Sequence, residues 1–215
     1  MTRPGTPPIP SPSPLHKEYL MPSKLRPDDA ILVFGDLQTG ITDLPLTIGE
    51  QGLRRSAWAL ARLGEIYDLP TIALCIPKGG DTNPAIIPEI TGTRSRYQRI
   101  MRTRPDSFEN DEFRKAIEAT GRKTLIVCGV ATEIVVQWLA LSGIAHGYKV
   151  HLVVDACGGL SARTEEAAFR RFEAAGVVMT SVVSLAGEIS GDFTAPPGSE
   201  AIGVVYQLIA GGYGR

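Results

Sequence analysis

Short apolar segments alternate with longer segments of helical periodicity, and this alternation is the feature that most constrains the fold. Residues 30–34, 71–75 and 124–128 are nearly continuous apolar runs, which are typical of strands buried on both faces. Two further strands are predicted at residues 150–154 and 177–180. Buried strands that are separated by helices predict right-handed crossover units and a mostly parallel sheet.

The segments between these runs have the spacing and the end signals of helices. In residues 48–67 the apolar side chains recur three and four positions apart, as on one face of a helix. We predict further helices at residues 110–120, 132–145, 161–175 and 199–210. Residues 77–93 contain a glycine pair and several prolines and are predicted to be a loop. The predicted fold class is α/β, a three-layer α/β/α arrangement of Rossmann-like type with a mostly parallel central sheet.

The domain organisation follows from length and from the proline-rich start of the chain. The 215 residues suit one domain. Residues 1–25 hold many prolines and no apolar segment of the kind found in signal peptides, so we predict a disordered tail. An arm that packs on a neighbouring subunit is the alternative. Residues 26–215 form the predicted domain, and no run of about 18 apolar residues predicts a membrane span.

Charge and composition argue against several classes of partner and cofactor. The formal net charge is −1 with no basic stripe, so neither nucleic acid nor an anionic membrane is an expected partner. Three cysteines without a CxxC pair indicate reduced thiols in a cytoplasmic protein. The three histidines lack metal-ligand spacing, so no metal is expected. Because neither a P-loop nor a GxGxxG turn is present, we expect no cofactor and a small-molecule substrate.

Chemistry is expected at the carboxyl ends of the strands, where open parallel sheets bind their ligands. Asp36 directly follows the first apolar run, in FGDLQTG. It is either a functional carboxylate or an ordinary turn residue. Arg102 and Arg104, in MRTRPDSFEND, are either solvated charges or cations that hold a carboxylate or an oxyanion. In GVATEIVV a strand leads into a helix, where backbone N–H groups can bind an oxyanion and Thr132 can act as a cap.

Several motifs in the same order resemble the isochorismatase-like (cysteine hydrolase) family. The segment ATGRKTLIVCGVATEIVVQWLALSGIAHGYKVHLVVDACGG resembles the family's central region, in which a Gly-Val-x-Thr turn leads to Cys-Val at a helix start. FGDLQTGI is similar to the family's Asp-x-Gln after the first strand, and RPDSFEN resembles the stretch after its catalytic lysine. The resemblance covers residues 26 to 190.

The resemblance implies a catalytic triad of an aspartate base, a lysine or arginine, and a nucleophilic cysteine that forms an acyl-enzyme. Asp36 matches the aspartate, and either Arg102 or Arg104 matches the cation. The cysteine position falls on Val135, which carries no nucleophile. The resemblance also implies a non-proline cis peptide between residues 130 and 131 and a homo-oligomer. The substrate-binding residues that it implies are Gln38, Val130, Ala131, Thr132 and Val135.

Three functional hypotheses remain open. The first is a hydrolase or lyase that acts on a small anionic or cyclic molecule through Asp36, without a covalent cysteine intermediate. True isochorismatases within the family also lack the cysteine, but they carry Ala-His where this chain has Thr132 and Glu133. The second is a non-catalytic ligand-binding or scaffold protein of the same fold. The third is an amidohydrolase with a relocated nucleophile, Cys157, which follows a predicted strand near the crevice.

Overall fold

The computed structural model describes residues 24–94 and 96–212. The predicted tail, residues 1–25, therefore lies outside the described residues except for its last two. Of these, Leu25 is already buried, and its backbone N–H donates to the Glu188 carboxylate at 2.5 Å. This contact joins the start of the described chain to a helix near the C-terminus.

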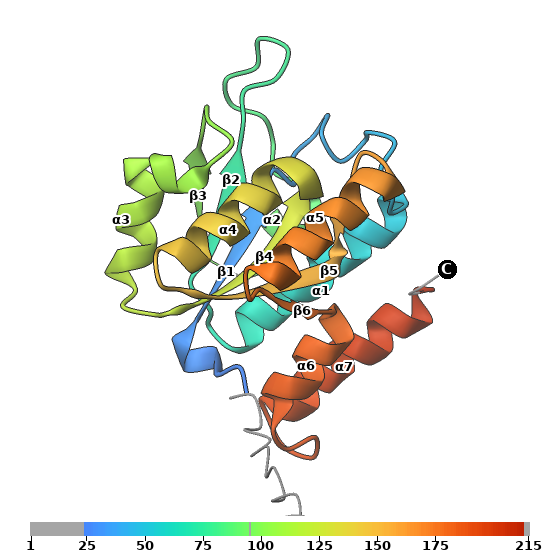
Figure 1. Cartoon of the computed structure of the whole chain (residues 1–215). Coiled ribbons are helices and arrows are strands. Elements are labelled where there is room, and N and C mark those ends of the chain that lie inside the picture. The colour runs from blue at the N-terminus through green and yellow to red at the C-terminus, as the bar shows by residue number, and fades with distance from the viewer. Residues whose placement is uncertain (1–23, 95, 213–215) are drawn as a thin grey trace, which may run out of the picture.

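A six-stranded parallel sheet forms the centre of the protein (Figure 1). Its strand order is β3-β2-β1-β4-β5-β6, and every neighbouring pair is parallel. The strands are β1 (Ala30–Gly35), β2 (Thr71–Cys75), β3 (Tyr97–Met101), β4 (Thr124–Val130), β5 (Lys149–Gly158) and β6 (Val178–Thr180). The predicted fold class is confirmed, since β1, β2 and β4 are fully buried runs in the middle of this sheet.

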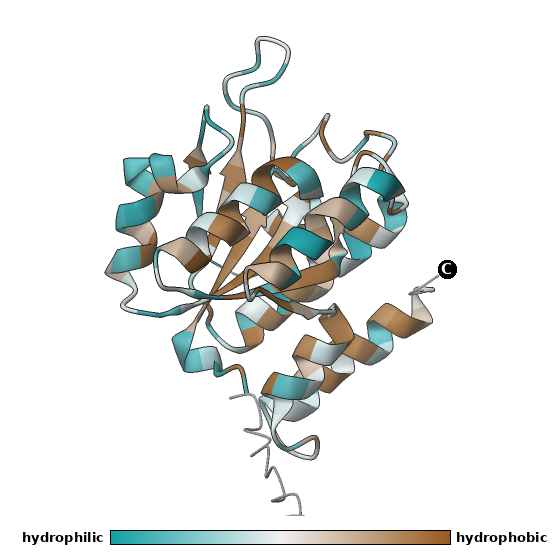
Figure 2. Cartoon of the chain, in the orientation of Figure 1, coloured by the Kyte–Doolittle hydropathy of each residue, from teal (hydrophilic) through white to brown (hydrophobic). Residues whose placement is uncertain are grey.

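Helices cover both faces of the sheet. Helices α3, α4 and α5 lie on one face, and α1, α6 and α7 pack together on the other (Figure 1). The helices are α1 (Glu50–Ile66), α2 (Pro88–Thr91), α3 (Asp111–Ala119), α4 (Gln137–Ala145), α5 (Ala162–Ala174), α6 (Val182–Ser190) and α7 (Gly198–Ala210). Short helical turns are η1 (Pro27–Asp29), η2 (Ser107–Glu109) and η3 (Thr132–Val136). Hydrophobic residues concentrate in the strands and on the inner helix faces (Figure 2).

Side chains cap the starts of α3 and α5. The Asn110 side chain accepts from the backbone N–H groups of Glu112 and Phe113 at the start of α3. The Ser161 hydroxyl accepts from the backbone N–H of Thr164 at the start of α5. These contacts satisfy N–H groups that have no partner within the helix.

Four elements differ from the sequence prediction. Helix α2 lies within residues 77–93, which were predicted to be a loop, because Pro88 starts a single helical turn there. Strand β3 was not predicted, because it is an edge strand in which Ile100 is buried and its neighbours are half-buried or exposed. Helix α6 was not predicted either. Strand β5 continues to Gly158, past a register shift against β4, so Cys157 lies within a strand rather than after one. Within the described ranges, no helix has the length and apolar character needed to cross a membrane.

Candidate active site

The candidate site lies between the carboxyl ends of β1 and β4, where the strand order changes direction. Gly129 of β4 is paired with Gly35 of β1. A Cβ atom on Gly129 would lie 2.1 Å from the Gly35 carbonyl oxygen, and its φ of 139° also favours glycine. Only glycine therefore allows this close approach of the two backbones. Asp36, which follows β1, and Val130, the last residue of β4, consequently share one opening.

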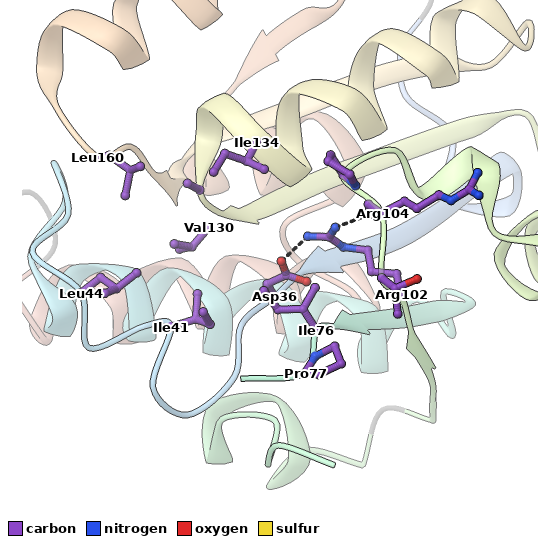
Figure 3. A pocket seen from close by; sticks show the side chains of 13 residues that line it. Asp36, Ile41, Leu44, Ile76, Pro77, Arg102, Arg104, Val130, Ile134 and Leu160 are labelled. Carbon is purple, nitrogen blue, oxygen red and sulfur yellow. Dashed lines mark hydrogen bonds and ion pairs between the residues drawn. The ribbon is translucent and has the colours of Figure 1, made fainter. Parts of the chain in front are cut away.

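Asp36 and Arg102 form a buried ion pair at the floor of this opening (Figure 3). Arg102 Nη2 donates to Asp36 Oδ2, and the two side chains are 5% and 3% exposed, respectively. Arg102 follows the end of β3, and its backbone N–H donates to the Cys75 carbonyl oxygen of β2 at 2.9 Å. The ends of β1, β2 and β3 thus position the pair.

The structure distinguishes the two candidate arginines. Arg102 Nη1 donates to the backbone carbonyl oxygen of Arg104 at 2.5 Å. The guanidinium of Arg102 is thus held by the loop backbone through one terminal nitrogen and by Asp36 through the other. The Arg104 side chain is 70% exposed and pairs with Glu109 at 3.1 Å. Arg102 is therefore the cation that faces Asp36, whereas Arg104 lies at the rim of the pocket.

Burial sets the electrostatics of Asp36. It raises the pKa of the carboxyl above its usual range, and the charge and hydrogen bond of Arg102 lower the pKa in partial compensation. Asp36 Oδ1 and Arg102 Nε are buried and have no hydrogen-bond partner among the described residues. A carboxyl in this position is suited to exchange a proton with a bound molecule.

A pocket of about 510 Å³ opens above this pair (Figure 3). Nine of its 13 lining residues are apolar. Ile41 and Leu44 follow β1, Ile134 belongs to η3, and Leu160 follows β5. The size and the concentration of polar groups at one end are typical of small-molecule sites.

The turn after β4 contributes backbone and small apolar groups to the pocket. The peptide bond between Val130 and Ala131 is cis, as the family resemblance implies, and both residues line the pocket. Thr132 is fully buried, and its hydroxyl donates to Glu165 Oε1 of α5 at 2.8 Å. The prediction that Thr132 caps the helix was therefore wrong: its hydroxyl ties η3 to α5, and the start of η3 has no side-chain cap. Thr132 is also not part of the pocket lining.

Val135 and Gln38 lie behind the pocket surface. Val135 is fully buried and covers Gly35, since an ideal Cβ on that glycine would be 3.1 Å from Val135 Cγ1. The Gln38 side chain is also fully buried, and its amide makes two hydrogen bonds, at 2.8 and 2.9 Å, with the backbone of Ile76. Gln38 therefore joins the loops after β1 and β2, and neither residue is among the lining residues.

The described cysteines lie outside this pocket. The Cys157 thiol is buried in β5 and donates to the Val153 carbonyl oxygen at 3.3 Å. Burial raises the pKa of the Cys157 thiol far above its usual range, and it also raises that of Cys128. The prediction that Cys157 follows a strand was thus wrong, because β5 continues to Gly158, and the buried thiol is not among the pocket lining. Cys75 is fully buried in β2.

Sequence reasoning missed the apolar walls of the pocket. Leu44 and Leu160 stand in loops that carry no motif, Ile41 ends the segment FGDLQTGI without having been singled out, and only the fold brings the three to one opening. Among the described residues, no group of three or more histidine, cysteine, aspartate or glutamate side chains could hold a metal ion.

Comparisons with known proteins agree with this geometry. The family model of the isochorismatase domain matches residues 75–183. The probable hydrolase YcaC of Escherichia coli (strain K12) is 32% identical over 171 residues, which cover 79% of this chain and 82% of that protein. Isochorismatase domain-containing protein 2 of Rattus norvegicus is 25% identical over 175 residues, covering 80% of this chain and 79% of that protein.

Solved structures show the same fold. The YcaC gene product from Escherichia coli, described as an octameric hydrolase of unknown specificity, superposes on this chain with a TM-score of 0.77 at 29% sequence identity. The match covers 88% of this chain and 90% of the YcaC chain. YcaC from Pseudomonas aeruginosa, solved with hexane-2,5-diol and covalent acrylamide, gives 0.79 at 29% identity, covering 87% and 95%. The chain therefore belongs to the isochorismatase-like family of hydrolases.

Proposed function

We propose that the protein is a hydrolase or lyase that uses Asp36 for acid/base catalysis on a small molecule, without a covalent cysteine intermediate. The observation that carries this proposal is the buried Asp36–Arg102 pair at the floor of an apolar pocket. Val135, which occupies the nucleophile position by resemblance, supports a mechanism without a thiol. The buried thiol of Cys157 does not favour that residue as a substitute.

The chemistry follows from the environment of the carboxyl. Because burial raises its pKa, Asp36 can hold a proton closer to neutral pH and give it to the reacting group of the substrate. The carboxylate that results is stabilised by Arg102 and can accept a proton from the water that completes the reaction. Val130 and Ala131, beside the pair, position the substrate against this carboxyl.

The proposal is tested by turnover of a panel of small vinyl ethers, esters and amides, with isochorismate and its release of pyruvate included. Wild-type protein is compared with Asp36→Asn, which keeps the shape of the side chain. Asn also tolerates the left-handed backbone of Asp36, whose φ is 53°. We expect turnover that is lost in Asp36→Asn and kept in Cys157→Ser. Turnover that needs Cys157 would instead support the amidohydrolase alternative.

The second candidate function is a binding or scaffold protein of the same fold. The absence of a thiol among the residues that line the described pocket favours it. Specific ligand binding without turnover of any member of the panel, by wild-type protein and Asp36→Asn alike, would support this candidate over catalysis.

We also propose that the protein is a cytoplasmic homo-oligomer. The three free, buried cysteines support a reducing compartment. The octameric state of the Escherichia coli relative supports self-association. Light scattering of the purified protein would give the mass of the assembly, and a monomeric mass at micromolar concentration would contradict the proposal.

A further inference from the structure

The charges at the pocket floor are already paired with one another. Arg102 donates to Asp36 and to the Arg104 carbonyl oxygen, so its two terminal nitrogens are engaged within the protein. At the rim, the Arg104 side chain pairs with Glu109. Arg102 Nε has no partner among the described residues, but the charge of Arg102 is already balanced by Asp36. An anionic ligand would therefore add a negative charge that no further cation compensates at the floor, and it would lose its hydration there.

One carboxylate oxygen of Asp36 has no hydrogen-bond donor. Asp36 Oδ1 is buried without a hydrogen-bond partner among the described residues, in a side chain that is 3% exposed and lines the pocket. In the ion pair with Arg102, before Asp36 takes up the proton that the proposed catalysis uses, the ionised carboxylate only accepts hydrogen bonds. A ligand group that reaches this atom must therefore carry an O–H or N–H, which an ionised carboxylate or a fully ionised phosphate ester lacks.

One side of the wall and rim is apolar. Leu44, Ile134 and Leu160 line the pocket and are 38%, 44% and 52% exposed, respectively. They come from three separate segments, the loop after β1, η3, and the turn after β5, and lie together on the side of the pocket away from Arg104 (Figure 3). Large apolar side chains that gather at the edge of a cavity are typical of a site that an apolar ligand covers.

We propose that the pocket takes a neutral molecule with an apolar body, whose hydrogen-bond donor meets Asp36, and that Leu44, Ile134 and Leu160 select it. This inference rests on the site of the proposed function and names the substrate class for it. It favours an apolar, cyclic or branched compound over the anionic substrates that the sequence left open. It makes the three rim residues specificity-determining residues rather than catalytic ones.

The test is equilibrium binding of three probes that share one aromatic body. 2-Naphthylmethanol is neutral and has a donor, its methyl ether is neutral without a donor, and 2-naphthoate is an anion without a donor. We expect the alcohol to bind, and the ether and the anion to bind about tenfold or more weakly, because each leaves the buried acceptor without a donor.

Matched variants locate the binding. Leu160→Asn should weaken binding of the alcohol about tenfold, since it places a polar side chain on the apolar rim. Ile209→Asn is the control, because Ile209 is similarly exposed, at 54%, but lies on α7 and outside the pocket lining.

Three results would overturn the inference. They are binding of 2-naphthoate as tight as that of the alcohol, loss of naphthoate binding in Arg104→Ala, and absence of binding by all three probes. Because the readout is binding, it is independent of turnover. A protein that binds the alcohol through Leu160 but turns over nothing would refute the catalytic proposal alone.

Discussion

Replacement of Arg102 by methionine would leave the Asp36 carboxylate alone at the buried floor of the pocket. The two side chains are 5% and 3% exposed, so water can replace little of the lost interaction. Methionine keeps much of the apolar volume of the arginine stem without its charge. Breaking a buried ion pair by removal of one partner costs about 3–5 kcal/mol, and we expect a loss in the free energy of unfolding of this size at neutral pH.

The loss should depend on pH in a direction that the structure decides. Burial already raises the pKa of the Asp36 carboxyl above its ordinary value, and Arg102 lowers it, so the pKa of this carboxyl in Arg102→Met must rise further. A carboxyl with a raised pKa binds more protons in the folded than in the unfolded state. Stability is then greatest in acid and falls as pH rises from the unfolded pKa through the folded one. The defect of Arg102→Met should therefore be smallest in acid and grow toward neutral pH.

Urea unfolding of four proteins measures this effect. They are the wild type, Arg102→Met, Asp36→Asn and the double variant, each followed from about pH 4 to about pH 8. The double variant carries no buried charge at this position, so it should be less destabilised than the sum of the single variants. Strictly additive effects, or a defect in Arg102→Met that is the same at every pH, would refute the buried, coupled pair.

Three further outcomes are expected. Gly129→Ala should lower the free energy of unfolding by about 3 kcal/mol or more, or prevent folding, because its Cβ would clash with the backbone of β1. Gly79→Ala is the control, since Gly79 has a φ of 58° but open space around it, and it should lower the stability by only about 1 kcal/mol in thermal unfolding. Val135→Cys should lower the free energy of unfolding by about 1 kcal/mol and introduce a thiol at the position next to Gly35. Alkylation of this thiol, followed by mass spectrometry, should be faster than in the double variant Val135→Cys, Asp36→Asn, because Asp36 can accept the proton of the thiol. Equal rates in the two proteins would contradict the role of Asp36 as a base. Ser161→Ala should lower the free energy of unfolding by about 1 kcal/mol through loss of the α5 cap, with no change in ligand binding.

The sequence was sufficient to predict the strands at the centre of the sheet but not the edge strand β3. Strands β1, β2 and β4 are buried along their whole length, so their composition alone separates them from helices. Strand β3 has a neighbour on one side only, and residues such as Gln98 and Arg99 can face outward there. Its pattern resembles that of a polar loop, which is why it was not predicted.

The site shows the same division. Asp36 could be found because it directly follows a recognisable strand, whereas the choice between Arg102 and Arg104 depended on a contact across 66 residues of sequence. Gln38 and Thr132 were predicted to bind substrate, but their polar groups are engaged by Ile76 and by α5, respectively. A polar residue in a motif can serve the loop that carries the site as well as the ligand, and only the fold distinguishes the two.

The pocket walls show why the fold and the charged residues of the pocket floor could be predicted better than the kind of substrate. Asp36 and Arg102 lie at strand ends, where the sheet determines their positions, while Leu44 and Leu160 lie in loops that different strands bring to one opening. Neither leucine contributes to the ion pair, and both are partly exposed. Because the walls and the floor are held by different segments, a change at Leu160 should alter which molecules bind while the Asp36–Arg102 pair and its pH-dependent stability remain as they are.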